Sequence, residues 1–183
     1  MRMSTLLGEV LPVLGTVGLL GLWLFQQMGI EERAGELRSV AAARAVYQTY
    51  QSHNSVFNAV NETVPNAKAT ERLRNYQTYN YELGLGAIER ALPPAMLSGI
   101  PPAINAFDGS PSFEVKMERT QQRVALLQSR LSDYEAAVRS AAQRDRKAYF
   151  IAYLVISALS IAGALIKVSD KLRAERQKAA ASP

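Results

Sequence analysis

The chain has 183 residues, of which 48% are hydrophobic, and its 21 basic and 16 acidic residues give a formal net charge of +5. It contains no cysteine, which excludes disulfide bonds, thiolate metal sites and cysteine nucleophiles. The basic excess is small and interleaved with acidic residues, so it does not predict nucleic-acid binding.

The first predicted element is an apolar helix over residues 10–30, which follows a short N-terminal tail over residues 1–9. The helix has no charged residue and matches the roughly 20 residues that cross a bilayer. A cleaved secretory signal is the alternative, but its apolar stretch is roughly 7 to 15 residues long. This run continues through Trp23, Leu24 and Phe25. We therefore predict a retained transmembrane helix.

Residues 31–147 are predicted to form a helical extramembrane domain, beginning with an amphipathic helix over residues 31–64. The apolar and aromatic side chains of this helix recur at three- and four-residue spacings or their sums, which places them on one face. They are Leu37, Ala41, Tyr47, Tyr50, Phe57, Val60 and Val64. Pro65 disfavours helical geometry at the residue before it, so the helix is expected to end there.

An acidic cluster of Glu31, Glu32 and Glu36 lies where the first apolar run ends. A cation site is one interpretation of this cluster. Arg33 and Arg38 favour the other interpretation, a network of salt bridges along the helix.

A second helix is predicted over residues 67–92, with apolar side chains on two of its faces. A helix that is apolar on two faces is expected to lie between two neighbours. Gly84 and Gly86 each weaken it by about 1 kcal/mol relative to alanine, and they predict close approach of another backbone.

The loop over residues 93–111 is unusual because residues 91–107 contain four prolines and no charged residue. Loops are normally polar, and the prolines prevent a regular helix, so this segment is not a third span. Either it caps the core at the tip of the helical domain, or it docks onto a partner subunit or a membrane interface. The candidate partner-binding residues are Leu92, Met96, Leu97, Ile100, Ile104 and Phe107.

A third helix is predicted over residues 112–147, and its apolar positions alternate steps of three and four, as in a coiled-coil seam. The seam consists of Met117, Thr120, Val124, Leu127, Leu131, Tyr134, Val138 and Ala141. Antiparallel packing of this helix on the first predicts a three-helix antiparallel bundle or coiled-coil domain. No glycine or proline separates the seam from the next apolar run, so movement of the helix is expected to pass directly to that run.

Residues 148–166 form a second charge-free apolar run that is predicted to cross the membrane. The predicted fold class is therefore all-α, with two transmembrane helices flanking the extramembrane domain. Small side chains in both runs predict close packing of the two transmembrane helices. These residues are Gly15, Gly18, Gly21, Ser157, Ser160, Gly163 and Ala164.

The C-terminal tail over residues 167–183 is basic and is expected to contact anionic lipid headgroups, at about 1 kcal/mol per cation. Its cations are Lys167, Lys171, Arg173, Arg176 and Lys178. The positive-inside rule gives full weight only to loops shorter than roughly 60 residues, so these cations count for more than those of the central domain. The rule predicts a two-pass protein with both tails on the cytoplasmic side and the central domain on the opposite side.

Candidate catalytic chemistry is sparse. His53 is the only histidine, and no serine elbow, glycine-rich phosphate loop or zinc-ligand spacing accompanies it. The tyrosines of the first two helices are expected to pack between helices and not to form a ligand-binding wall. We therefore predict no enzyme activity, no catalytic, cofactor or metal site, and no small-molecule ligand. Residues 61–63 (Asn-Glu-Thr) match a glycosylation sequon. A motif this short often occurs by chance.

Three functions fit this organisation. We predict a structural, assembly or accessory subunit of a membrane complex, which contacts lipid and other membrane proteins or copies of itself. The second function is a transmembrane sensor, because a helical bundle between two spans resembles in outline the ligand-binding half of bacterial transmembrane chemoreceptors. The third is an oligomeric pore or membrane-perturbing effector, which requires a polar face on the second span, where the sequence offers only Ser157 and Ser160.

Overall fold

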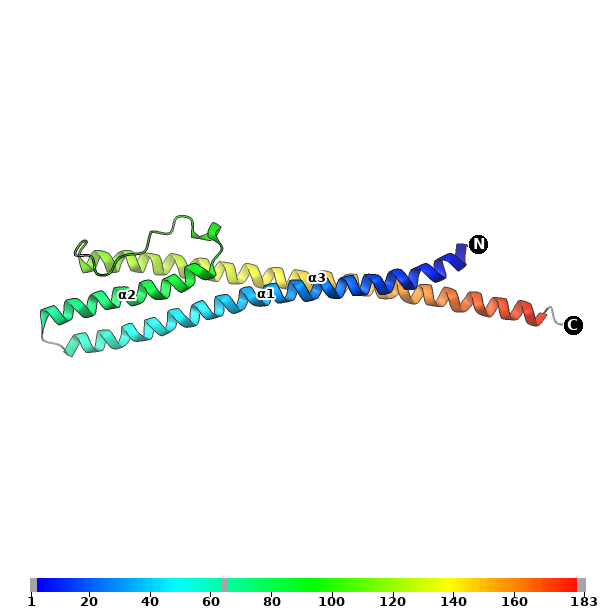
Figure 1. The fold of residues 1–183 in the computed structure, drawn as a ribbon, viewed down its shortest axis with the longest axis horizontal. Coiled ribbons are helices and arrows are strands. Elements are labelled where there is room, and N and C mark those ends of the chain that lie inside the picture. The colour runs from blue at the N-terminus through cyan, green and yellow to red at the C-terminus, as the bar shows by residue number, and fades with distance from the viewer. Residues whose placement is uncertain (1–2, 64–65, 181–183) are drawn as a thin grey trace. The chain divides into compact units, whose positions relative to one another are not determined.

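The computed structural model describes the backbone of residues 3–63 and 66–180 and the side chains of residues 7–63 and 66–177. These residues form α1 (Met3–Thr63), α2 (Ala67–Ala91), a short 3-10 helix η1 (Pro94–Leu97) and α3 (Phe113–Ala180), as Figure 1 shows. No strand occurs over these described ranges, so the predicted all-helical class is confirmed there. Val64, the last residue of the first predicted helix, lies outside them.

The chain divides into two compact units. The terminal unit consists of Met1–Glu32 and Ala141–Pro183, and the central unit consists of Arg33–Ser140. Both α1 and α3 contribute residues to each unit, whereas α2 and the loop after it belong to the central unit alone.

Local sequence sets the ends of α2. The Asn66 side chain accepts a hydrogen bond from the Lys68 amide at 3.0 Å, which caps the first turn of the helix. Leu92 has an extended backbone, with ψ of 142°, as expected for a residue that precedes a proline. The helix therefore ends at Ala91, directly before the proline-rich loop.

One apolar core lies inside the central unit, and all three of its helices contribute to it. The buried residues of this core are Val40, Ala43, Tyr47, Leu85, Ile88, Leu92, Leu127 and Leu131. Gly84 allows α1 and α2 to approach, because a Cβ atom there would lie 3.2 Å from Cδ2 of Tyr47. Gly86 is different, since its nearest neighbour is the flexible end of Arg90 at 3.7 Å. Of the two glycines, only Gly84 lies where another helix comes close.

The direction of each helix in the central unit follows from its contacts. Gln77 donates a 2.8 Å hydrogen bond to Asn58, while Gly84 lies against Tyr47, so α2 runs antiparallel to α1. Glu82 contacts Thr120 and Glu89 contacts Arg123, so α3 runs parallel to α2. It follows that α3 is antiparallel to α1. The parallel pairing of α2 and α3 departs from the predicted antiparallel bundle.

The loop between α2 and α3 makes this parallel arrangement possible. Figure 1 shows it returning beside the first turns of α3. Phe107 contacts Tyr76 and Tyr79 in the first half of α2, although the loop leaves α2 at Ala91. The loop therefore runs along the side of the central unit, which differs from the predicted cap over its tip.

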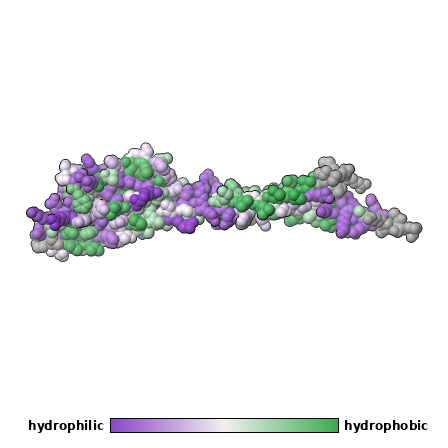
Figure 2. Space-filling model, viewed as in Figure 1, coloured by the Kyte–Doolittle hydropathy of each residue, from purple (hydrophilic) through white to green (hydrophobic). Residues whose placement is uncertain are grey.

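The terminal unit contains the two predicted spans. Its helices include windows with mean hydropathy of 1.7 and 2.2, which are long and apolar enough to cross a membrane. Only 11% and 6% of these windows is buried within the protein, whereas the core helix of a soluble protein is mostly buried. Figure 2 shows the resulting hydrophobic band.

Candidate functional site

The two apolar helices of the terminal unit approach closely at several of their glycines. A Cβ atom on Gly15 would lie 1.7 Å from the hydroxyl of Ser160, so no larger residue fits without movement. A Cβ atom on Gly163 would lie 2.7 Å from Cβ of Leu11. A Cβ atom on Gly18 would lie 3.3 Å from Cδ1 of Ile156. Predicted small residues on both helices therefore line this contact.

Other predicted packing residues lie away from the closest approach. A Cβ atom on Gly21 would have no neighbouring atom within 4 Å, Ala164 is exposed and Ser157 is half-buried. The Ser160 hydroxyl donates a 3.0 Å hydrogen bond to the Ile156 carbonyl of its own helix. Gly8, which sequence reasoning missed, would place a Cβ atom 3.5 Å from the backbone of Lys167.

The predicted membrane-surface cations lie on the last turns of α3. Lys167, Lys171, Arg173 and Arg176 are exposed. The side chain of Lys178 lies outside the described residues. The four described cations are thus accessible to a charged surface.

The predicted partner-binding residues of the loop do not share one environment. Leu92 is buried in the core of the central unit, and Met96, Leu97 and Ile100 pack against it. Ile104 is half-buried, whereas Phe107 is 53% exposed. Most of the apolar side chains of the loop therefore contact their own chain.

Phe107 belongs to an exposed aromatic cluster with Tyr76 and Tyr79. Its ring centroid lies 5.5 Å from that of Tyr76 and 5.6 Å from that of Tyr79. The two tyrosines are 49% and 42% exposed. Beside the cluster, a shallow groove of about 450 Å³ extends past Arg74 and Phe113. The Arg74 guanidinium lies over the Phe113 ring, 5.1 Å from its centroid.

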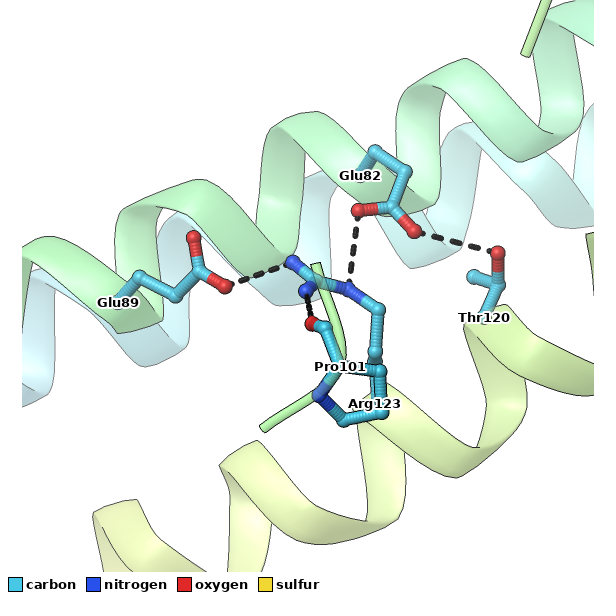
Figure 3. Close-up of polar contacts among 5 residues, drawn as sticks. All are labelled: Glu82, Glu89, Pro101, Thr120 and Arg123. Atoms are coloured by element: carbon cyan, nitrogen blue, oxygen red, sulfur yellow. Dashed lines mark hydrogen bonds and ion pairs between the residues drawn. The ribbon is translucent and has the colours of Figure 1, made fainter. Parts of the chain in front are cut away.

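A buried arginine joins α2, α3 and the loop. Arg123 on α3 is 1% exposed, and its guanidinium contacts Glu89 at 2.6 Å and Glu82 at 3.2 Å (Figure 3). It also donates a hydrogen bond to the Pro101 carbonyl. Thr120 donates a 3.2 Å hydrogen bond to the other carboxylate oxygen of Glu82. Burial raises the pKa of Glu82, and Arg123 and Thr120 oppose this shift.

A buried lysine fixes the second half of the loop. Lys116 is 3% exposed, and its ammonium group donates hydrogen bonds to the carbonyls of Ala106, at 3.0 Å, and Asp108. The Asn105 side chain donates to Asp108 at 2.8 Å and accepts from the Phe107 amide at 3.1 Å. Lys116 thus gives hydrogen-bond partners to two loop carbonyls, and Asn105 ties the Asp108 side chain to the Phe107 amide.

Sequence reasoning missed both buried cations, because the pattern that predicts burial on α3 is its apolar seam, and neither residue belongs to that seam. A signal was nevertheless present. Glu82 and Glu89 are seven residues apart, which places both carboxylates on one face of α2 and predicts a cation on a neighbouring helix. Arg123 is that cation, whereas Lys116 contacts loop carbonyls.

The remaining candidate residues are His53 and the acidic cluster of Glu31, Glu32 and Glu36. His53 is exposed and meets only the edge of the Tyr50 ring, with centroids 6.1 Å apart. Over the described ranges, no group of three His, Cys, Asp or Glu residues is arranged to hold a metal ion. Within the acidic cluster, Arg33 pairs with Glu36 at 3.0 Å, whereas Arg38 donates to the Ala34 carbonyl.

The predicted tyrosine packing is seen in part. Tyr47 is buried in the core, and burial raises the pKa of its hydroxyl. Two small grooves of about 220 and 290 Å³ lie beside it, between α1 and α3. Tyr76 and Tyr79 are instead exposed, so the tyrosines do not form one wall.

Comparison with known proteins gave no relative. No family model matches the chain, and no curated protein or solved structure is significantly similar to it.

Proposed function

We propose that this chain is a non-catalytic two-pass membrane protein that acts as a structural or accessory subunit of a membrane complex. The observation that carries the proposal is the exposed aromatic cluster of Tyr76, Tyr79 and Phe107 on a unit that belongs to the same chain as two apolar helices. Aromatic side chains are enriched in the cores of protein interfaces, where they contribute much of the binding energy.

Membrane insertion is supported by the exposure of the apolar windows. Val17, Phe25 and Leu165 are among their exposed side chains, at 62%, 68% and 64%. Each buried apolar side chain contributes about 1.5–3 kcal/mol when it leaves water, so lipid is the favourable surrounding for these faces. We propose that both tails lie on the cytoplasmic side, with the exposed cations of α3 at the headgroups.

The partner contact is proposed to centre on the aromatic cluster. Four apolar side chains of the loop pack into the core of the central unit and so anchor the loop: Leu92, Met96, Leu97 and Ile100. Phe107 is exposed and is proposed to contact the partner. Arg123 and Lys116 hold the loop carbonyls on either side of Ile104, which fixes Phe107 beside α2. A preorganised contact of this kind loses little conformational entropy on binding.

The test is the mass and composition of the particle extracted from its native membrane in mild detergent. We expect a stoichiometric foreign membrane protein with the unaltered chain, and loss of that protein when Tyr76, Tyr79 and Phe107 are all changed to Ala. The matched control changes Leu126 to Ala, because this exposed apolar residue lies on α3 and lines neither the cluster nor the groove beside it. The control should retain the partner.

A particle that contains only copies of this chain would overturn the accessory-subunit proposal. The sensor and pore alternatives would then be separated by two measurements. A ligand-dependent rise in melting temperature would favour a sensor. Leakage of dye from liposomes that contain the purified chain would favour a pore.

A further inference from the structure

Residues 45–61 of α1 carry no acidic or basic side chain apart from His53, although 20% of all residues are charged. This segment lies in the central unit, between Arg44 and Glu62. One face of it packs inward through Tyr47 and Asn54, which are 4% and 1% exposed. The absence of charge extends to the outward face, where a helix in water normally carries charged residues.

The outward face also has an apolar pattern. Val46, Val56 and Val60 are 40%, 62% and 40% exposed. Together with other exposed residues they alternate steps of four and three, the spacing of a coiled-coil seam. This outer seam consists of Ala42, Val46, Thr49, His53, Val56 and Val60. In Figure 2, hydrophobic side chains reach the lower left surface, where the last turns of α1 run.

Small side chains lie beside the outer seam. Ala45, Ser52 and Ala59 are exposed and follow one another at intervals of seven residues. Side chains of this size allow a second helix to come close without steric conflict. The outer seam therefore has apolar side chains at its centre and small side chains beside them, as a surface for helix packing requires.

We propose that the outer seam binds the outer seam of a second copy of this chain, with the two α1 helices parallel and in register. In such a twofold arrangement each residue near the axis faces its own counterpart. Any charged residue on the face would therefore meet a like charge. The charge-free segment from 45 to 61 removes this repulsion, whereas a surface for a foreign partner has no such requirement.

Membrane anchoring supplies the parallel orientation. Two copies inserted in one membrane share the same topology, so their central units lie on the same side. Confinement to a membrane also raises the effective concentration of the helices, which offsets the weakness of a short coiled coil. This part of the inference rests on the proposed membrane insertion, but it does not depend on a foreign partner at the aromatic cluster.

The purified full-length chain in lipid nanodiscs tests the inference, and the absence of native cysteine provides a clean background. Two single-cysteine variants are oxidised separately under the same conditions: Val56→Cys, in the outer seam, and Ser55→Cys, at the exposed neighbouring position outside it. We expect Val56→Cys to give about tenfold more disulfide-linked dimer than Ser55→Cys, because only position 56 meets its counterpart. Equal crosslinking at the two positions would overturn the inference.

A charge variant provides a second readout. Val56→Lys should reduce self-association by at least about tenfold in native mass measurements, because it places two like charges together at the proposed axis. Position 56 is exposed, so the helicity should not change, and the melting temperature should fall only by what the unaltered chain gains from association. Val115→Lys, at an exposed position on α3, should leave the dimer intact. A monomeric unaltered chain, or a foreign protein crosslinked at position 56 in its native membrane, would contradict self-pairing.

Discussion

Arg123 is the residue on which the loop, α2 and α3 depend together. Its guanidinium is almost fully buried and contacts Glu82, Glu89 and the Pro101 carbonyl. A buried ion pair contributes modestly in total, because both charges lose hydration. Removal of one partner is costly, because the other charge remains buried without compensation.

Arg123→Met is therefore expected to lower the free energy of unfolding by about 3 kcal/mol, since Glu82 would be left without its cation. Denaturant unfolding of the full-length chain, followed by helical circular dichroism in detergent, measures this change. Arg130→Met is the matched control, because Arg130 lies on the same helix and is exposed. Equal effects of the two substitutions would show that the buried network contributes little.

Glu82 should give stability a distinctive pH dependence. Burial raises its pKa in the folded state, so the folded chain holds this proton more tightly than the unfolded chain does. The contribution of Glu82 to stability therefore falls as pH rises from about 4.3, the unfolded pKa, through the raised folded pKa. Glu82→Gln avoids this loss, so its melting temperature relative to the unaltered chain should be higher at pH 7 than at pH 4.

Glu135→Gln serves as the control of opposite sign. Hydrogen bonds from Arg139 and then Arg44 lower the pKa of Glu135, so this carboxylate stabilises the fold above its unfolded pKa. That contribution is lost as pH falls. The melting temperature of Glu135→Gln relative to the unaltered chain should therefore be lower at pH 7 than at pH 4. The same trend with pH in both variants would refute the account of Glu82.

At the scale of the helices, the terminal unit depends on how closely α1 and α3 approach. Gly15, Gly18 and Gly163 lie at this approach, whereas Gly21 has no neighbour within 4 Å. Small residues stabilise transmembrane pairs because they allow extensive van der Waals contact. The helix contact is therefore local, and it can be tested position by position.

Gly18→Cys combined with Ile156→Cys is expected to form a disulfide within one chain. A Cβ atom at position 18 would lie 3.4 and 3.7 Å from the two γ carbons of Ile156. The sulfur of a cysteine at position 156 would lie near one of these carbons, so the two sulfur atoms can come within bonding distance. Gel mobility with and without reductant measures it in nanodiscs. Gly21→Cys with Ile156→Cys is the control, and comparable crosslinking in that pair would contradict the helix contact.

The α3 seam shows how much sequence periodicity can predict. Leu127, Leu131 and Val138 are buried, as a face with three- and four-residue spacing should be. The course of the loop could not be predicted in the same way. It depends on hydrogen bonds from Lys116 and Arg123 to loop carbonyls, and periodicity does not identify such partners.

At the scale of the whole molecule, apolar composition identified the two candidate spans, because length and absence of charge are properties of the local sequence. The aromatic cluster was only partly predictable. Phe107 was a candidate residue, but Tyr76 and Tyr79 join it only because the loop returns along the central unit. Partner contacts require this tertiary arrangement, so composition alone did not locate the cluster.

The central claim is that both apolar helices cross one membrane and place the central unit on the opposite side from both tails. Single cysteines introduced by Glu9→Cys, Ser98→Cys and Gln177→Cys test it, because all three positions are exposed and the chain has no other cysteine. The measurement is their reaction with a membrane-impermeant maleimide in sealed vesicles, before and after permeabilisation. The account predicts that positions 9 and 177 react from one side and position 98 only from the other. Reaction of all three from the same side, or of positions 9 and 98 from the same side, would contradict it.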